Sequence, residues 1–242
     1  MEISTGDFFC WSDASCWSRL LSIPKSRALS LEALQSRLET MYRGIVLFHG
    51  CRPESVDIYL ERGLLAGSVQ RTDGNLLRLF FGEEPTAQEL DAYRHASEEV
   101  RWKYDLQENK VFTAVDHRFL VEHAGTYLIY GAERGVDIAV RLPKILSKPE
   151  LQFIDLLTNI GRPTILQTRQ PWAQLGESNT LKIAEKIAQT LGKAAGGKRA
   201  PLGDLSITVS GSINACDVAV HSFPTRIKDP RKHRIEYRYT DE

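Results

Sequence analysis

The 242-residue sequence lacks any run of the roughly 18 apolar residues that a membrane-spanning helix requires. Its first residues, Met-Glu-Ile-Ser-Thr-Gly-Asp, lack the basic and apolar regions of a secretory signal peptide. The sequence also has no internal repeat, no P-loop and no G-x-G-x-x-G fingerprint after an expected strand. These absences predict a cytoplasmic protein without a membrane partner, and they disfavour kinase and Rossmann-type functions.

Cysteine is scarce, and positive and negative charges are balanced. Four cysteines are scattered along the chain, and their spacing matches no common zinc knuckle, so we expect reduced, mostly buried thiols and no bound metal. The 31 basic and 31 acidic residues cancel, which disfavours a protein that coats nucleic acid with its whole surface. A composition of 42% hydrophobic and 26% charged residues is that of an ordinary globular protein.

Hydrophobic periodicity predicts helices and strands in an irregular order. Ser30 caps an expected helix that ends at Gly44, and Thr86-Ala-Gln-Glu89 is a capping box that opens another. β-branched and aromatic residues predict strands at 45–48, 110–114, 163–168, 205–209 and 218–221. The lack of regular strand–helix alternation favours an α+β fold over a doubly wound sheet.

Three other segments have weaker patterns. Residues 66–75 are polar and glycine-containing, which predicts a loop. Residues 126–130 are apolar and indicate a strand, with a helix as the alternative. Residues 136–160 are helical in part, with expected breaks at Pro143 and Pro149.

The segment Leu47-Phe48-His49-Gly50-Cys51-Arg52 places a histidine at the end of a buried strand. Gly50 permits close approach of a ligand or of another backbone, and the imidazole of His49 can donate or accept a hydrogen bond. A histidine that merely caps a turn is the alternative.

This segment begins a block, LFHGCRPESVDIYLERGL, that resembles the opening motif of the diphtheria-toxin-like branch of the ADP-ribosyltransferase superfamily, which includes the poly(ADP-ribose) polymerases. KVFTAVDHRFLVEHA resembles the second core segment of that branch, and GRPTILQTRQP and LSITVSGSINACDVAVHSF resemble its later strands. The resemblance spans roughly residues 44–223. It implies a split mixed β-sheet in a domain over residues 44–242, with residues 1–43 as an N-terminal helical extension packed on it.

The resemblance also implies NAD⁺ as substrate, bound between two small sheets. His49 and Gly50 would contact its ribose or nicotinamide groups. Arg52 could meet the pyrophosphate, because a guanidinium pairs well with phosphate oxygens, and a solvent-facing arginine at a helix start is the alternative. An aromatic ring would stack on the nicotinamide, and the candidates are Phe112, Tyr127 and Tyr130. On a strand Tyr127 and Tyr130 would face opposite sides, whereas on a helix they would share a face.

The family uses an acid, usually glutamate, which contacts the nicotinamide ribose and stabilises an oxocarbenium-like transition state. The sequence departs from the family here, because Ser206 stands about where that glutamate falls and Asp204 lies two residues earlier. Glu133, in Tyr127-Leu-Ile-Tyr130-Gly-Ala-Glu133, is the first candidate for the acid and Asp204 the second. The alternative for Glu133 is a solvated charge beside Arg134, and the alternative for Asp204 is a loop residue or a helix-to-strand turn.

Basic residues indicate the acceptor. A glycine-rich loop at 192–204 contains Lys193, Lys198 and Arg199, which suit a phosphate backbone. Residues 226–238 add further arginines and lysines, and Tyr237 and Tyr239 could stack on bases. The expected function is therefore transfer of ADP-ribose to a nucleic acid or protein, as a toxin or antiphage defence effector that an antitoxin or inhibitor protein would restrain. The alternatives are a non-catalytic NAD- or nucleic-acid-binding pseudoenzyme and an RNA 2′-phosphotransferase-like enzyme, which needs several converging arginines.

Overall fold

A computed structural model describes residues 7–22, 30–105, 108–149, 153–194, 200–232 and 235–240. Within these residues the protein is α+β, with eleven α-helices, a six-stranded and mostly antiparallel sheet, and a separate two-stranded hairpin. The expected α+β class is confirmed. None of the described helices is long and apolar enough to cross a membrane.

The main sheet is divided at one junction. Its strand order is β5-β3-β2-β4-β6, with the short β1 (Phe8–Phe9) added in parallel to β2. β2 pairs with β4 at eight positions and β3 pairs with β5 at five, whereas β2 and β3 pair only at Phe48 and Ala114. The sheet is therefore split between β2 and β3. The strand bounds are β2 (Gly44–Cys51), β3 (Lys110–Ala114), β4 (Thr164–Pro171), β5 (Ser206–Ser210) and β6 (Val218–Ser222).

The central strand β2 is covered on both faces. Its apolar run, Ile-Val-Leu-Phe, is fully buried, and His49 is its one half-buried residue. Gly50 is buried under a short helix, α7 (Thr126–Tyr130): a Cβ there would lie 3.3 Å from Leu128 Cδ2. The close approach that Gly50 permits is thus that of α7 to the sheet.

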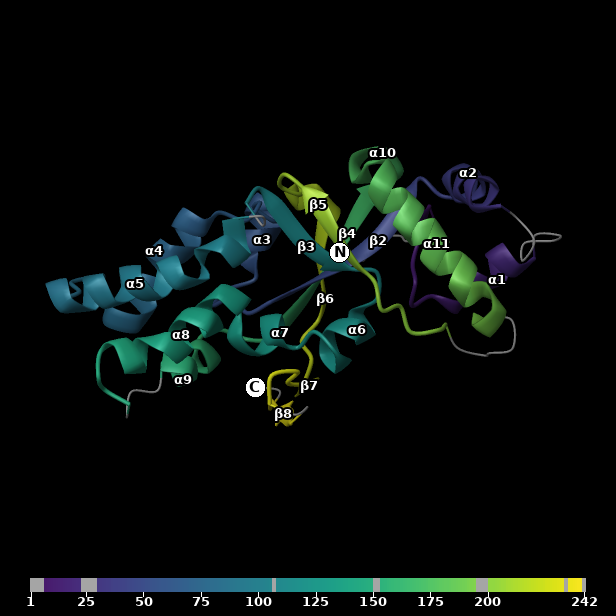
Figure 1. Ribbon diagram of the computed structural model, residues 1–242. Coiled ribbons are helices and arrows are strands. Elements are labelled where there is room, and N and C mark those ends of the chain that lie inside the picture. Colours follow the sequence, from purple (N-terminus) through teal and green to yellow (C-terminus); the bar gives the residue numbers. More distant parts are fainter. Residues whose placement is uncertain are drawn as a thin grey trace.

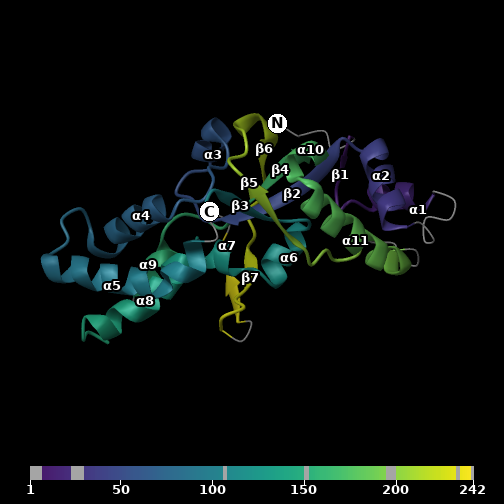
Figure 2. The same ribbon diagram turned by 45° about the horizontal axis from the view of Figure 1, so that its top comes forward.

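Helices flank the sheet on two sides, as Figures 1 and 2 show. One group packs through α5–α8, α8–α9 and α4–α5 contacts, and the other through α11–α2 and α1–α11 contacts. The first group is α4 (Val69–Phe81), α5 (Ala87–Tyr104), α8 (Glu133–Ile145) and α9 (Phe153–Asn159). The second is α1 (Ala14–Leu21), α2 (Leu31–Met41), α10 (Trp172–Leu175) and α11 (Glu177–Ala194). The remaining helices are α3 (Asp57–Arg62) and α6 (His117–Glu122), and the C-terminal hairpin is β7 (Arg226–Lys228) with β8 (Glu236–Arg238).

Three expectations about local structure were wrong. Only residues 66–68 of the expected loop at 66–75 are non-helical: α4 begins at Val69, because the Ser68 side chain caps the helix and Leu76 and Phe80 are buried along it. Residues 126–130 form a helix, which was the alternative. Pro143 does not break α8, because the buried residues Ile138 and Leu142 hold the helix against its neighbours.

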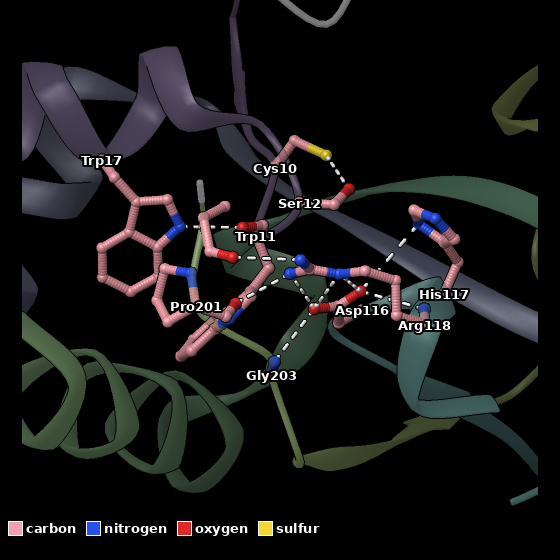
Figure 3. Close-up of polar contacts among 10 residues, drawn as sticks. Cys10, Trp11, Ser12, Trp17, Asp116, His117, Arg118, Pro201 and Gly203 are labelled. Atoms are coloured by element: carbon pink, nitrogen blue, oxygen red, sulfur yellow. Dashed lines mark hydrogen bonds and ion pairs between the residues drawn. The ribbon is translucent and has the colours of Figure 1, made fainter. Parts of the chain in front are cut away.

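The described part of residues 1–43 belongs to the core. Phe9, Trp11 and Trp17 are almost completely buried and meet edge to face. Figure 3 shows how this segment meets a distant loop: Trp11 Nε1 donates to the carbonyl oxygen of Pro201 at 2.9 Å. Gly203 is needed there, because a Cβ on it would lie 2.7 Å from Trp11 Cδ1.

A buried ion pair completes this junction (Figure 3). Asp116 is fully buried and accepts hydrogen bonds from Arg118 Nη2 at 2.6 Å and from the backbone N of Gly203 at 2.9 Å. The Arg118 guanidinium also donates to the carbonyl oxygens of Ala200 and Pro201. The N-terminal segment, α6 and the 200–203 loop are thereby held as one unit.

Candidate functional site

A cavity of about 120 Å³ lies where α4, β3, α7 and α8 meet. Phe112 reaches it from β3, Tyr127 from α7, and Glu133 from the first turn of α8. The aromatic rings and the carboxylate that the sequence singled out therefore line one cavity. Its other lining residues are Gly67, Ser68, Val69, Thr72, Tyr104, Glu108, Lys110, Ala132 and Arg134.

A glycine turn brings Tyr127 and Glu133 together. α7 ends at Gly131, whose φ of 79° is a conformation that side-chain-bearing residues rarely adopt. The chain reverses there and α8 begins at Glu133. Burial raises the pKa of the Tyr127 phenol, and the nearby charge of Glu133 raises it further, so the phenol is protonated near neutral pH.

The Glu133 carboxylate is accessible and faces a cation. About 31% of its side chain is exposed, and its Oε2 lies 3.9 Å from Lys103 Nζ. Lys103 is itself held by Asp137 Oδ2 at 2.8 Å. Glu133 is therefore fixed at the cavity wall by a helix start and by one neighbouring ammonium group.

His49 lies next to this cavity without lining it. Its Nδ1 is 2.8 Å from the carbonyl oxygen of Phe112, across the split between β2 and β3. A carbonyl only accepts hydrogen bonds, so Nδ1 carries the proton. Burial lowers the pKa of His49, which keeps the ring neutral near pH 7 and leaves Nε2 as an acceptor.

A second, wider cavity of about 700 Å³ adjoins the first, and the two share Thr72 and Ala132. It is lined mainly by α3, α4 and the turn after α7, and Ile58, which is 48% exposed, is one of its apolar residues. The two cavities therefore lie side by side, the smaller one against β3 and the wider one against α3.

Arg52 has a structural role at the end of β2. Its guanidinium donates to the carbonyl oxygens of Ile160, Leu128 and Thr158, and it stacks on the Tyr239 ring at 5.1 Å. These contacts fasten α7 and the C-terminal segment to the end of β2. These three hydrogen bonds use three of the five guanidinium N–H groups, and Arg52 also lines the wider cavity, so the expected pyrophosphate contact stays a prediction.

Tyr130 is directed away from Tyr127. It is buried, and its hydroxyl donates to Asp229 Oδ2 at 2.6 Å and lies 3.3 Å from the Tyr237 hydroxyl. Tyr130 therefore anchors the C-terminal hairpin. Tyr127 and Tyr130 line adjoining cavities, Tyr127 the smaller and Tyr130 the wider, so the role expected for Tyr130 stays a prediction.

Asp204 lies at a different place from Glu133. It forms an ion pair with Lys186 at 2.6 Å and lines a separate cavity with Phe119, His123 and Thr190. Lys193 lies in the last turn of α11, so the expected loop begins later than residue 192, and Lys198 and Arg199 lie outside the described residues. The structure thus brings only Glu133 of the two acids to the aromatic cavity.

The basic C-terminal segment is largely paired within the protein. Lys228 binds Glu122, Arg231 binds Asp137 and Arg238 binds Glu236. The Tyr237 hydroxyl accepts from Lys232 Nζ at 2.9 Å, and the Tyr239 ring lies against Arg52. Several residues of this segment that were expected to meet a nucleic acid therefore have partners within the protein.

Sequence reasoning missed Arg134, which lines the aromatic cavity and is 4% exposed. It pairs with Asp73 through Nε at 2.7 Å and through Nη2 at 2.8 Å. The sequence did contain a pattern that indicates a buried position for this arginine. The buried face of α8 presents Arg134, Ile138 and Leu142 at helical spacing. A charged residue within an apolar stripe predicts a buried ion pair or a ligand contact.

Within the described residues, no group of three His, Cys, Asp or Glu side chains is placed to hold a metal ion. The chain matches no family model, and comparisons with curated proteins and with solved structures gave no match. The geometry of the aromatic cavity is therefore the principal guide to function.

Proposed function

We propose that the protein is an NAD⁺-dependent ADP-ribosyltransferase with a split-sheet core of that superfamily's type. One observation carries the proposal: Phe112, Tyr127 and Glu133 line a single cavity beside the His49-Gly50 strand end. The first block of the sequence resembles the family at that strand end, and the division of the sheet between β2 and β3 is compatible with the family's split sheet.

In this proposal the nicotinamide ring enters the cavity between Phe112 and Tyr127. The bond between nicotinamide and ribose breaks, and positive charge develops at the anomeric carbon. The Glu133 carboxylate stabilises that charge electrostatically and binds the ribose 2′-hydroxyl. ADP-ribose then passes to a nucleophile on a macromolecular acceptor, and nicotinamide leaves.

His49 would orient the substrate. With Nδ1 committed to the Phe112 carbonyl, Nε2 accepts a hydrogen bond from a ribose hydroxyl. The wider cavity on the other side of Thr72 and Ala132 would take the adenosine portion. The dinucleotide would thus span the two adjoining cavities, past Thr72 and Ala132.

The acceptor would be a nucleic acid or a protein, in keeping with a toxin or defence effector. The paired charges of the C-terminal hairpin give no preference for nucleic acid. The RNA 2′-phosphotransferase alternative gains no support, because the Arg52 guanidinium already serves three backbone carbonyls.

The test is nicotinamide release from NAD⁺ by the purified protein, alone and with RNA, DNA or cell lysate. We expect Glu133→Gln to lower kcat by about 10²–10³-fold, the usual effect of losing one electrostatic group at a developing charge. Asp204→Asn makes the same chemical change at the other candidate acid, and we expect it to retain activity. Glu108→Gln, in the same cavity, tests the remaining carboxylate there.

Each other result has a defined meaning. Loss of activity in Asp204→Asn with activity retained in Glu133→Gln would move the acid to Asp204. If the wild-type protein released no nicotinamide with any acceptor, the transferase proposal would be contradicted and a non-catalytic binding module would be favoured.

A further inference from the structure

Arg134 is a buried cation with an unused hydrogen-bonding group. Its Nε and Nη2 bind Asp73, and Nη2 also donates to Ser97 Oγ at 2.7 Å. Its Nη1 is buried and has no hydrogen-bond partner among the described residues. A buried charged donor without a partner is costly, so such a group in a cavity wall points to a ligand atom that completes it.

The surroundings of Arg134 define the ligand. The cavity that it lines also contains the rings of Tyr104, Phe112 and Tyr127, and the Arg134 guanidinium lies 5.4 Å from the Tyr104 ring centre. Aromatic walls favour a flat ring, and a guanidinium nitrogen donates only to an acceptor. A flat ring that carries a carbonyl or carboxylate oxygen satisfies both requirements.

Arg134 is held rigidly for this role. The Tyr93 hydroxyl and the Ser97 hydroxyl bind the same Asp73 carboxylate that pairs with Arg134. The guanidinium therefore does not need to reorganise when a ligand enters. Since Nε and Nη2 are already engaged, Nη1 is the nitrogen with hydrogen bonds left to give.

We infer that Arg134 is a specificity-determining residue that donates from Nη1 to an oxygen on a pyridine-type ring bound between Phe112 and Tyr127. For NAD⁺ this oxygen is that of the nicotinamide carboxamide, an identification that rests on the proposed function. Glu133 and Arg134 are consecutive, so the start of α8 supplies one residue for the ribose end of the nicotinamide and one for its carboxamide.

This arrangement makes an unusual prediction about specificity. Because Arg134 only donates, the site accepts a carboxylate in place of the carboxamide. Nicotinate binds at least as tightly as nicotinamide, and nicotinic acid adenine dinucleotide is bound where NAD⁺ is bound. Pyridine, which lacks the oxygen, leaves the donor unsatisfied and binds about tenfold or more weakly.

The experiment measures binding of nicotinamide, nicotinate and pyridine to the full-length protein by ligand-observed NMR titration. We expect wild-type protein to discriminate against pyridine, and Arg134→Lys to bind all three ligands with similar affinity. Lysine keeps a positive charge beside Asp73 but has no second nitrogen that could donate to the ligand while the first binds Asp73. The matched control is Arg141→Lys on the same helix, where the side chain pairs with Glu99, and it retains the wild-type discrimination. Circular dichroism verifies that both variants are folded.

Several outcomes would overturn the inference: pyridine binding as tightly as nicotinamide, rejection of nicotinate, no binding of any ring, or unchanged discrimination in Arg134→Lys. The wild-type comparison requires no variant, so misfolding of Arg134→Lys leaves the inference testable. The two proposals fail separately. If the protein discriminates between the rings but does not cleave NAD⁺, the transferase proposal fails and the ring-binding site stands. If it cleaves NAD⁺ without discriminating between the rings, the transferase proposal stands and the role of Arg134 fails.

Discussion

Replacing Asp116 with asparagine removes the charge on which the N-terminal junction depends. The Asp116 carboxylate is fully buried and binds the backbone N and Nε of Arg118, each at 3.0 Å, besides Arg118 Nη2 and the Gly203 N–H. Asparagine has nearly the same shape but places an NH₂ group where an acceptor stood. In either orientation of the amide, this NH₂ faces another donor.

The loss of stability expected for Asp116→Asn follows from the burial of the Asp116–Arg118 ion pair. Removing one partner of a buried ion pair costs about 3–5 kcal/mol, and the lower end applies because 34% of the Arg118 side chain is exposed. For a chain of this length, about 3 kcal/mol lowers Tm by roughly 6–12 °C. Loosening of the 200–203 loop also exposes Trp11, whose Nε1 donates to the Pro201 carbonyl.

Thermal unfolding followed by circular dichroism measures the first effect, and a red shift of tryptophan emission measures the second. Asp204→Asn is the matched control, because it breaks an ion pair with Lys186 at 2.6 Å in which 56% of the Asp204 side chain is exposed. An exposed pair contributes about 1 kcal/mol or less, so this variant melts within a few degrees of wild type. Equal Tm values for the two variants would refute the argument that Asp116 holds the N-terminal segment.

Two further predictions concern the helices around the cavity. Hydrogen bonds from Lys103, Arg231 and Tyr104 lower the pKa of Asp137 to about 2, although burial alone would raise it. The ionised Asp137 stabilises the fold fully above the ordinary aspartate pKa near 4, and this stabilisation is lost as the pH falls towards 2. Asp137→Asn therefore lowers Tm at pH 7 and makes Tm decline less steeply below pH 4. A decline of Tm as steep as that of wild type would contradict this. Gly131→Ala meets no steric obstacle, with Arg52 Cβ 3.8 Å away, but the backbone at φ 79° and ψ −42° is sparsely populated by side-chain-bearing residues and costs an alanine about 1–3 kcal/mol. We expect urea unfolding to show this loss and NAD⁺ cleavage to fall by more than stability alone explains; unchanged activity would show that the turn does not position the acid.

Much of the fold follows from local sequence signals. The capping box at Thr86 forms both reciprocal hydrogen bonds with Glu89, and the strand expected at 110–114 has the bounds of β3. The errors occurred where local composition competes with packing. Residues 66–75 contain polar side chains and a glycine that are typical of a loop, yet Leu76 and Phe80 lie further along and bury one face of the helix.

The sequence predicts contacts of the candidate site between residues that are close in sequence better than contacts between residues that are far apart in sequence. Tyr127 and Glu133 lie either side of one glycine turn, so their convergence could be expected from the sequence. Arg52 follows the His-Gly pair directly, but its environment depends on carbonyl groups of residues 128, 158 and 160, which only the folded chain brings to it. The pairing of Arg134 with Asp73 was likewise hidden, because 61 residues separate the partners.

The position of Glu133 in the fold also accounts for the missing acid at Ser206. Ser206 begins β5, which pairs with β3 at Ala114, whereas the cavity is reached from Phe112, two residues earlier on β3. Glu133, at the start of α8, lines this cavity together with Phe112, Tyr127 and Arg134. An acid supplied by a helix start needs only the Gly131 turn to aim it. If Glu133 is the acid, as proposed, the chain needs no glutamate on β5, and the absence of one there does not by itself argue against catalysis.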